Sequence, residues 1–582
     1  MTYQMTERAK ESVRTLTKAA YDACVREGLL PSGAPDLMPV EVPKDPSNGD
    51  YTTTFALAAS KAMRKNPRET ADLLVRHIDL DGSYFQEVSI AGPGFINFRL
   101  GDRWYGEVLC AVEAEGATYG SSDMLAGEKI MVEFVSANPT GPMHMGNARG
   151  GVLGDTLAAV LARVGAEVSR EFYVNDAGNQ IEKFAASIEA RYLQLIHGED
   201  AVPFPEDGYH GDDIRELARA YLDTEGTALA EKSTEERHAA LAAFGLARNI
   251  PKMKSDLERY GIRYDKWFFE SELHESGYVA ATVELLASRG FTYEKDGAVW
   301  LKTADIMRGI YRAAGKSDEE IDRLDLKDDV LRRANGFYTY FAADIAYHRN
   351  KFDRGFTRCI NVWGADHHGH VARMKGSLDA LGLNGTEKLD IVLMQLVKLM
   401  RDGEVVRMSK RTGKAISLTD LLDEIPVDAC RFFFNMTKPE STMEFDLGLA
   451  VREDSENPVY YVQYAHARTC SLIRMMQEEG LTVADAKDLS LSLLTAEEEK
   501  ALIKQLAFYP DVLRLAARNY DPSHVNRYLV DLAGHFHRFY TACRCRGEAA
   551  DLAAARLKLA DCTRLVLQNG LTLIGCSAPE KM

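Results

Sequence analysis

The sequence predicts an α/β protein whose central domain holds a doubly wound parallel sheet, between a smaller N-terminal α/β domain and a C-terminal bundle of α-helices. An apolar run at 131–135 is followed by a Pro- and Gly-rich loop and by a helical pattern from His144 to Leu161. A second apolar run at 168–174 completes the alternation of strand, helix and strand that is typical of a parallel sheet. From about residue 455 the apolar pattern is helical throughout, which indicates a separate helical domain.

Length and composition limit the class of protein. At 582 residues the chain is expected to hold about three or four domains, at roughly 150 residues each. No run of about 18 apolar residues occurs, and the first residues lack the apolar stretch of a secretion signal, so we expect a cytoplasmic protein with no membrane span. The nine cysteines are scattered, and the spacing of Cys543 and Cys545 fits no common zinc pattern, which favours reduced thiols.

The net charge of −17 argues against a nucleic-acid partner, because an acidic surface repels phosphate on average. RNA binding by such a chain needs local basic patches, or recognition of RNA shape and splayed bases. Motifs therefore have to outweigh the charge before an RNA partner is inferred.

Residues 1–120 are expected to form the N-terminal α/β domain. A helical pattern covers Ala9–Glu27, and a second helical stretch covers about 54–77. Val88–Ile90 and Phe95–Phe98 have the composition of strands, and the Ala-Gly-Pro-Gly between them is typical of a turn.

The central domain is expected at 121–454. Asn175–Gln180 follow the second strand, where they either face a ligand at the strand ends or form a turn with helix caps. Residues of about 190–300 are mostly charged and helical, which indicates an insertion. The sheet is expected to resume near Gly297–Leu301.

The helix that begins near His144 is a candidate phosphate site. A helix N-terminus offers free backbone N–H groups and a favourable dipole to an anion. His144 and Asn147 are three residues apart, so both side chains lie on one face of the first turn, where they can donate hydrogen bonds without adding negative charge. The alternative is a helix N-terminus with an incidental histidine.

A second candidate segment is the basic loop Arg407–Lys414, which has four basic residues and no acid. It follows Ile391–Val397, a buried helix or strand, and precedes a predicted helix at Leu418–Ile425. Such a loop suits a triphosphate on which charge develops during a reaction, and the loss of one donor from a site of this kind costs about 10²–10³ in rate. The alternative is a solvated basic loop with no ligand.

Together these segments resemble the class I aminoacyl-tRNA synthetases. His144-Met145-Gly146-Asn147 is similar to their HIGH signature, and residues 133–142 before it resemble the arginyl-tRNA synthetase version of that signature. Met408-Ser409-Lys410 lies in a segment similar to the KMSKS loop, although Arg407 and Arg411 replace its first Lys and its last Ser. The resemblance covers essentially the whole chain, in order.

The resemblance implies a fold, a reaction and a set of site residues. The central domain would be Rossmann-like, domain 1–120 would contact tRNA, and domain 455–582 would bind the anticodon. L-Arginine would be activated by ATP with Mg²⁺ and passed to the 2′-hydroxyl of the terminal adenosine of tRNA(Arg), by an enzyme that is a monomer by family default. The catalytic residues would be His144, Asn147 and Lys410. ATP would be bound by Pro142, His144, Gly146, Asn147, Gly364, Asp366, Met408, Ser409 and Lys410.

An arginine site needs buried acids, because a planar guanidinium with five donors matches carboxylates. Glu133 and Asp344 are single acids in apolar runs, and an unpaired buried acid is costly unless a cationic ligand compensates it. The alternative for Glu133 is a structural salt bridge. The resemblance implies an arginine site, with the two acids and a tyrosine at the guanidinium, made of Glu133, Ser136, Asn138, Tyr340, Asp344 and His367.

The segment Gly364–His370 contains three histidines and one aspartate. His367, His368 and His370 cannot easily converge on one ion from a strand end, and no cysteine is near, so no metal site is predicted. In the family this Gly-x-Asp segment closes the adenosine pocket, where Gly364 would allow close approach of the adenine ring. Which of the three histidines contacts substrate stays open.

Aromatic residues with arginine at 457–468 and 535–540 can stack RNA bases, although helix core is the simpler explanation for most of them. Two alternative functions remain. Another class I synthetase would show zinc ligands near its pocket, as the cysteinyl enzyme does, or cations for an acidic substrate, as the glutamyl enzyme does. A non-catalytic RNA-binding paralogue would be expected to lack His144 or Lys410, and both are present.

Overall fold

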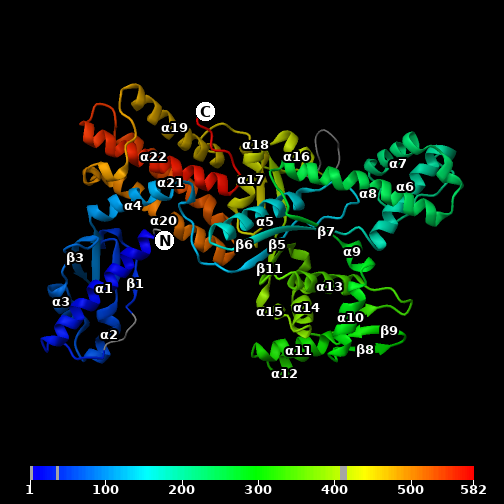
Figure 1. The fold of residues 1–582 in the computed structure, drawn as a ribbon, viewed down its shortest axis with the longest axis horizontal. Helices are drawn as coiled ribbons and strands as arrows, with labels where there is room; N and C mark the ends of the chain where they lie inside the picture. The colour runs from blue at the N-terminus through cyan, green and yellow to red at the C-terminus, as the bar shows by residue number, and fades with distance from the viewer. Residues whose placement is uncertain (1–3, 34–37, 407–415) are drawn as a thin grey trace.

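In the computed structural model, residues 4–33, 38–406 and 416–582 are described. The N-terminal unit is a four-stranded antiparallel sheet in the order β1-β2-β4-β3, packed with helices (Figure 1). Its elements are α1 (Met5–Arg26), β1 (Val40–Glu41), β2 (Tyr51–Thr53), α2 (Phe55–Met63), α3 (Pro67–His77), β3 (Phe85–Ala91), β4 (Phe95–Leu100) and α4 (Asp102–Glu115).

The N-terminal elements expected from the sequence are confirmed, with one correction. β3 and β4 contain the two predicted strands, and α1 covers most of the first predicted helix. The stretch at 54–77 is two helices, because Arg64 adopts a left-handed φ of 49° and Pro67 begins α3. The Asn66 side chain accepts a hydrogen bond from the Arg68 N–H at 2.9 Å and caps the second helix. The dipeptide Asn66-Pro67 is the sequence signal for this break.

The central domain is built on a five-stranded sheet in the order β12-β11-β5-β6-β7. Every pair in it is parallel, and its strands are β5 (Lys129–Glu133), β6 (Glu167–Val174), β7 (Lys266–Phe269), β11 (Arg358–Gly364) and β12 (Leu389–Met394). Because the chain runs outward from β5 first to one side and then to the other, the sheet is doubly wound, which confirms the predicted fold class. The carboxyl ends of β5 and β11 lie side by side at this reversal point, where such folds bind ligands.

The sheet resumes earlier than the sequence predicts. Its third strand is β7, and the expected resumption near 297–301 is wrong. Residues 298–301 instead form β9 of a separate antiparallel sheet, made of β8 (Thr292–Lys295), β9 (Ala298–Leu301) and β10 (Asp329–Arg332). Asp296 and Gly297 both have positive φ, as in the tight turn that joins β8 to β9. β7 is four residues long and only three of them are apolar, Trp267, Phe268 and Phe269, so its apolar run is too short to stand out between helices.

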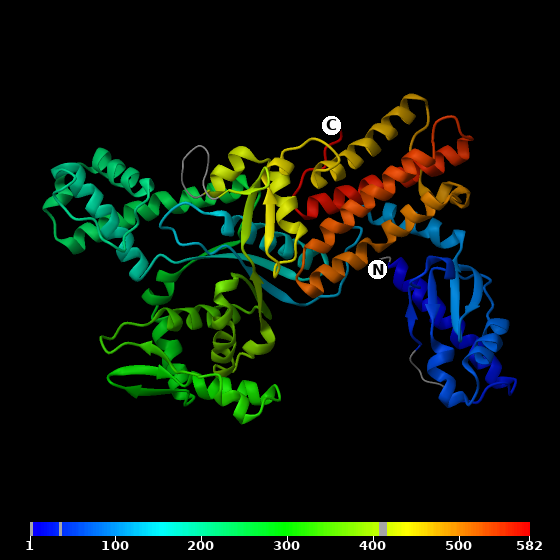
Figure 2. The same ribbon diagram turned by 180° about the vertical axis from the view of Figure 1, so that it is seen from behind.

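The predicted helix after β5 is confirmed as α5 (Met145–Arg163). Three helices, α6 (Asn179–His197), α7 (Asp212–Glu225) and α8 (Thr234–Arg259), share a small core of their own at the end of the molecule opposite the N-terminal unit (Figures 1 and 2). The other helices of this domain are α9 (Glu270–Glu275), α10 (Tyr278–Ser288), α11 (Thr303–Ala313), α12 (Asp318–Asp322), α13 (Tyr340–Asp353), α14 (His368–Ala380), α15 (Gly385–Lys388), α16 (Leu418–Glu424), α17 (Val427–Met436) and α18 (Leu447–Ala450).

A further small sheet, β14-β13-β15, is made of β13 (Val397–Arg401), β14 (Glu404–Val405) and β15 (Met443–Asp446). The segment at 391–397, left open between helix and strand, is mostly the strand β12, and the helix predicted at 418–425 is confirmed as α16. The sequence on both sides of the basic loop therefore has the expected structure.

In the described residues from 455 onward, every regular element is helical, as predicted. The long helices are α19 (Pro458–Glu478), α20 (Glu497–Asn519), α21 (Ser523–Ala542) and α22 (Ala550–Leu573). One continuous apolar core joins them to the N-terminal unit and to α5. Among the described helices, none combines the length and the apolar character that a membrane crossing needs. All nine cysteines are free thiols.

The buried Arg431 of α17 joins three parts of this arrangement. Its guanidinium donates to Asp155 of α5 at 2.5 Å, to the Ile574 carbonyl at 3.0 Å and to the Tyr260 carbonyl at 3.2 Å. Asp155 also accepts a hydrogen bond from Arg170 at 3.0 Å. These contacts fix α5, whose N-terminus is the candidate phosphate site, against the end of the C-terminal helices.

Replacement of Arg431 by Met is expected to destabilise the protein by about 3–5 kcal/mol, because it leaves Asp155 and two buried carbonyls without this donor. The unfolding midpoint in urea measures the change. Arg259→Met is the matched control, because Arg259 pairs with Asp423 at the surface, where such pairs contribute about 0–1 kcal/mol. Equal losses in the two variants would contradict the role given to Arg431.

Candidate active site

The carboxyl ends of the parallel strands surround a cavity of about 740 Å³. The loop after β5, the end of β6, the start of α9, one side of α13 and the end of β11 line it. These segments are distant in the sequence, and the strand order brings them together. The residues predicted from the sequence that line this single cavity are Glu133, Ser136, Asn138, Tyr340, Asp344, Gly364, Asp366 and His367.

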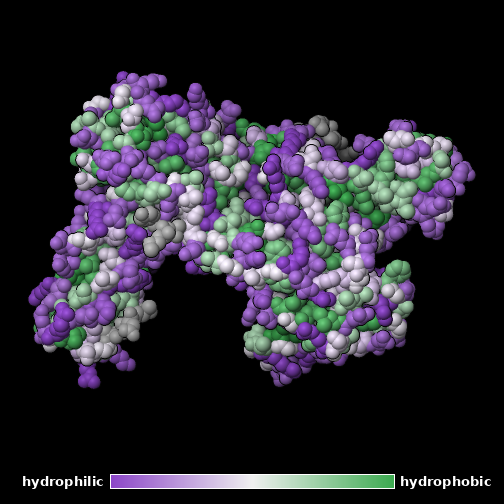
Figure 3. Space-filling view, in the orientation of Figure 1, coloured by the Kyte–Doolittle hydropathy of each residue, from purple (hydrophilic) through white to green (hydrophobic). Residues whose placement is uncertain are grey.

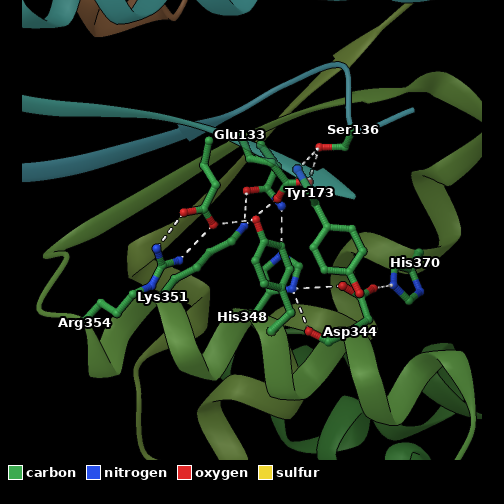
Figure 4. A network of polar contacts seen from close by, with 11 residues as sticks. Glu133, Ser136, Tyr173, Asp344, His348, Lys351, Arg354 and His370 are labelled. Carbon is green, nitrogen blue, oxygen red and sulfur yellow. Dashed lines mark hydrogen bonds and ion pairs between the residues drawn. The ribbon is translucent and has the colours of Figure 1, made fainter. Parts of the chain in front are cut away.

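The two predicted acids have cationic or imidazole partners within the protein (Figure 4). Glu133 accepts a hydrogen bond from the ammonium of Lys351 at 2.5 Å and one from the Ser136 hydroxyl at 2.9 Å. Asp344 contacts Nδ1 of His348 at 3.0 Å and Nε2 of His370 at 2.6 Å. Both acids therefore have partners within the protein, so neither requires a cationic ligand to offset its burial. For Glu133, the alternative of a structural salt bridge describes what the protein contains.

Helix spacing could have revealed these partners. Asp344, His348 and Lys351 are at positions i, i+4 and i+7 of α13, so they share one face of that helix. The ammonium of Lys351 has no solvent exposure, and a fully buried lysine requires a carboxylate nearby. Lys351 does not stand out in the sequence because it lies among the polar and charged residues of 348–354, where a lysine is usually exposed.

The Asp344 carboxyl favours its ionised form. Burial raises its pKa, but hydrogen bonds from His348 and His370 and the charge of His370 oppose this effect, and the pKa lies below its ordinary value. About a third of the Asp344 side chain, 31%, is open to the cavity. The cavity therefore contains a fixed negative charge that a ligand can reach.

A third acid, Glu270, lines the cavity and was missed in the sequence. Its buried side chain accepts a hydrogen bond from the Tyr173 hydroxyl at 2.8 Å and contacts His274 at 3.4 Å. Burial, followed by the charge of Glu270, raises the pKa of Tyr173 far above its ordinary value, so this hydroxyl stays protonated and donates. Glu270 directly follows β7, so it could be assigned to a strand end only once that short strand was recognised.

Two buried side-chain oxygens in the cavity have no partner. Oδ1 of Asn175 and Oε1 of Gln180 accept no hydrogen bond from the described part of the chain. Both residues line the cavity, and the segment between them also forms the turn into α6, so the structure contains features of both alternatives for 175–180. Because an unsatisfied buried acceptor is costly, these oxygens favour a ligand that brings N–H donors.

The predicted phosphate site is formed at the first turn of α5. His144 is its N-cap residue, and the His144 backbone N–H donates to the side-chain oxygen of Asn147 at 3.0 Å. This leaves the Asn147 NH₂ group as a donor. A side chain at Gly146 would meet the His144 ring at 3.3 Å, so a glycine lets the ring lie over this turn. Partial burial lowers the pKa of His144, which favours a neutral imidazole.

Backbone contacts place this turn beside Ser417 and Leu418, at the start of α16. The Leu418 N–H donates to the Met143 carbonyl at 2.8 Å, and His144 and Ser417 form a β-bridge. Pro142 lies in the exposed loop just before the helix. The other predicted ATP-binding residues, Met408, Ser409 and Lys410, lie outside the described residues.

The loop after β5 contains a strained turn. Val135 has a φ of 69° and Ser136 a φ of 41°, in the left-handed region that residues other than glycine rarely adopt. The Ser136 N–H closes this three-residue turn on the Phe134 carbonyl at 3.0 Å, which is the rare form of the γ-turn. Strain of this kind costs on the order of 1–3 kcal/mol and clusters at functional sites. Here it turns the Ser136 hydroxyl back to Glu133.

The arrangement suits a small cation with several N–H donors, held beside a site for phosphate. Four carboxylates, those of Glu133, Glu270, Asp344 and Asp366, and two unpartnered oxygens line one cavity, and the chain runs from it directly into the first turn of α5. Within the described ranges, no group of three or more His, Cys, Asp or Glu side chains could hold a metal ion.

Protein-family models match the chain in three regions. The arginyl tRNA synthetase N terminal domain matches residues 10–100, the catalytic domain of the class I (R) tRNA synthetases matches 112–221, and the DALR anticodon binding domain matches 462–582.

Curated relatives are similar over their full length. An arginine–tRNA ligase of Acetivibrio thermocellus is 49% identical over 577 residues, which covers 99% of this chain and 99% of that protein. One of Ruminiclostridium cellulolyticum is 50% identical over 574 residues, which covers 98% of this chain and 99% of that protein. The solved structure of the Thermus thermophilus arginyl-tRNA synthetase is 22% identical, with a TM-score of 0.70 over 98% of this chain and 100% of that one, so the fold is shared.

If Val135 is strained, glycine should be better tolerated there than alanine. Val135→Gly is expected to be more stable than Val135→Ala by about 1 kcal/mol, because only glycine adopts a positive φ freely. Urea unfolding measures the difference. Val88 in β3 is the control, because at an ordinary strand position the alanine variant should be the more stable one. An alanine variant at 135 as stable as the glycine variant would show that the turn stores no strain.

Proposed function

The chain belongs to the arginyl-tRNA synthetase family and is a class I arginine–tRNA ligase, and on that premise we propose which of its residues bind each substrate and carry the reaction. Its substrates are L-arginine, ATP and tRNA. The relatives decide against the other class I enzymes and the non-catalytic paralogue that the sequence left open. The observation that carries the proposed residue assignments is the cavity at the reversal point of the sheet, beside the N-terminus of α5.

The guanidinium of arginine is proposed to lie between Asp344 and Glu270, with Tyr340 at the rim. Asp344 carries a charge that is open to the cavity. Among the described residues, the partners of the Glu270 carboxylate are the Tyr173 hydroxyl and the more distant His274 imidazole. The unpartnered oxygens of Asn175 and Gln180 supply further acceptors for the five guanidinium donors. Lysine lacks this planar fork and would leave acceptors unsatisfied, a situation that can discriminate by about 10⁴ or more.

The other end of arginine is proposed to lie against the strained loop after β5. Ser136 and Asn138 are placed to hold its α-amino and carboxylate groups, with His367 on the opposite wall of the cavity. Glu133 adds negative charge and holds Ser136 in place. Since this loop continues into His144, the arginine carboxylate would lie next to the α-phosphate of ATP.

ATP is proposed to bind across the ends of β5 and β11. Pro142, Gly146, His144 and Asn147 would hold its phosphates, together with Met408, Ser409 and Lys410 of the basic loop. A side chain at Gly364 would meet the Asp366 carboxylate at 2.5 Å and would displace this exposed group from the place proposed for the adenosine. Mg²⁺ would be bound mainly by phosphate oxygens, as is usual for this ion. The described residues form no group of three or more His, Cys, Asp or Glu side chains that could hold a metal ion by themselves.

The reaction follows from this placement. The arginine carboxylate attacks the α-phosphorus, the bond to the β-phosphate breaks, and pyrophosphate leaves with the electron pair. His144, Asn147 and Lys410 donate hydrogen bonds to the charge that develops, so positioning and electrostatics suffice without a covalent enzyme intermediate. The 2′-hydroxyl of the terminal adenosine of tRNA(Arg) then attacks the carbonyl carbon of arginyl-adenylate, and AMP leaves.

The outer domains are proposed to bind tRNA. The N-terminal unit, residues 1–120, and the lobe built on β8–β10 and α11 are separated by an open recess (Figure 3). In the helical domain, 455–582, the guanidinium of Arg468 lies 3.8 Å from the ring centroid of Tyr540, and Tyr464 beside it is 39% exposed. An arginine stacked on tyrosines offers a platform for anticodon bases. We propose a cytoplasmic monomer that activates arginine only after tRNA has bound.

Alanine at His144 or Lys410 tests the catalytic assignment. Each substitution is expected to lower the arginylation rate by about 10²–10³ while leaving the circular dichroism spectrum unchanged, because each removes one donor to the developing charge. Lys398→Ala, at an exposed position of β13, is the control and should keep the wild-type rate. Wild-type turnover by either site variant would refute its catalytic role.

Asparagine at Asp344 tests the guanidinium assignment. Asp344→Asn is expected to raise the KM for arginine by about 10–100-fold, since a hydrogen bond to a charged group contributes about 1.5–3 kcal/mol, and to change the KM for ATP much less. Asp353→Asn carries the same substitution on the same helix, away from the cavity, and should leave both constants unchanged. An equal effect of Asp344→Asn on both substrates would exclude the proposed role.

A further inference from the structure

A continuous chain of polar contacts joins the two acids that flank the arginine cavity (Figure 4). From Glu133 the contacts run to Lys351 at 2.5 Å, from Lys351 to Asn361 at 3.0 Å, and from Asn361 to His348 at 2.7 Å. His348 then contacts the Asp344 carboxylate at 3.0 Å. Lys351 and Asn361 do not line the cavity, so they act on a bound substrate only through their neighbours.

The ammonium of Lys351 fixes the orientation of the Asn361 amide. An ammonium group can only donate hydrogen bonds, so the amide presents its oxygen to Lys351 and its NH₂ group to the other side. The opposite orientation would place two donors against each other in a site with no solvent exposure. The Asn361 NH₂ group therefore points at Nε2 of His348.

This orientation determines the protonation of His348. A nitrogen that accepts a hydrogen bond from an amide carries no proton, so Nε2 is the bare nitrogen and the ring is neutral. The proton lies on Nδ1, which faces the backbone carbonyl of Asp344 at 2.9 Å and its carboxylate at 3.0 Å. The His348 side chain is 1% exposed, so water cannot take over the role of the amide.

We propose that Lys351 and Asn361 are positioning residues for arginine, which keep His348 neutral so that Asp344 meets the guanidinium with its charge uncancelled. This inference rests on the proposed arginine pocket. A doubly protonated His348 would place a permanent cation against Asp344 and would compete with the substrate. His370 also contacts Asp344, but it is 21% exposed and can move aside for a ligand, which the buried His348 cannot.

Asn361→Asp is the decisive variant. An aspartate still accepts a hydrogen bond from Lys351, but it cannot donate to Nε2 of His348, so the ring takes up a second proton. The KM for arginine is expected to rise about tenfold, and the KM for ATP to change less than twofold. Added negative charge alone would strengthen the binding of a cation, so a rise cannot be a simple charge effect.

The spectrum of His348 gives a direct readout. In protein labelled with [¹⁵N]histidine, the His348 signals are identified by their loss in His348→Gln. The wild type should show one bare and one protonated nitrogen at neutral pH, and Asn361→Asp should show two protonated nitrogens. A doubly protonated His348 in the wild type would overturn the proposal, whether or not the variant folds.

Two further variants separate the electrostatic role from a structural one. Asn361→Leu removes the amide without adding a charge to the buried site, so it should lower the unfolding midpoint and raise the KM for arginine less than Asn361→Asp does. Asn350→Asp is the control for Asn361→Asp. It replaces an asparagine of α13 that lines a different cavity, and it should change neither the KM for arginine nor the KM for ATP. Equal rises in the KM for arginine in Asn361→Leu and Asn361→Asp would overturn the proposal.

Failure of this inference is distinguishable from failure of the pocket itself. If Asp344→Asn raises the KM for arginine and Asn361→Asp does not, the pocket stands and the positioning role of Lys351 and Asn361 falls. If Asp344→Asn leaves the KM for arginine unchanged, the guanidinium is bound elsewhere, and both proposals fall.

Discussion

The ion pair between Lys351 and Glu133 is the contact on which the rest of the site depends. Both side chains are almost without solvent, so each charge would be costly to bury alone. Together they place an acid at the end of the central strand and tie α13 to the sheet. The second oxygen of Glu133 holds Ser136, which fixes the strained turn and the start of the loop to α5. One buried cation thus sets both the electrostatics of the cavity and the path of the chain beside it.

The parts of the fold that could be predicted from the sequence are those whose signal is local. The segment from β5 to α5 combines an apolar run, a Pro- and Gly-rich loop and a helical period within about 35 residues, and it was predicted correctly. The same holds for β6 and for the helices after 455. β7 was missed because its three apolar residues, between two helices, are too few to show a period. The composition of 298–301 is that of a strand in the central parallel sheet or in a separate antiparallel sheet. The sequence signal that favours an antiparallel hairpin is the Asp296-Gly297 turn before it.

The site shows the same division. Glu133, Ser136 and His144 lie within one short segment, so their shared location follows from the chain itself. Glu270 depended on recognising β7, and the partners of Glu133 and Asp344 depended on how α13 packs under the sheet. An acid in an apolar run, such as Glu133, is correctly predicted to be buried. The sequence does not predict whether a substrate or a lysine 218 residues away balances its charge. The residues proposed to bind substrate were found more readily than those that hold them in place.

The strand order also bears on how the protein is made. β5 lies between β6 and β11, and the residues of β11 that pair with it are synthesised more than 200 residues after β5. At about 5–20 residues per second, one edge of the central strand waits roughly 10–45 s for its partner. During that time an apolar strand edge and the lone carboxylate of Glu133 are exposed on the ribosome-bound chain, which is the kind of surface that chaperones cover. The catalytic cavity, whose walls include β11 and α13, can only form after these late segments have been made.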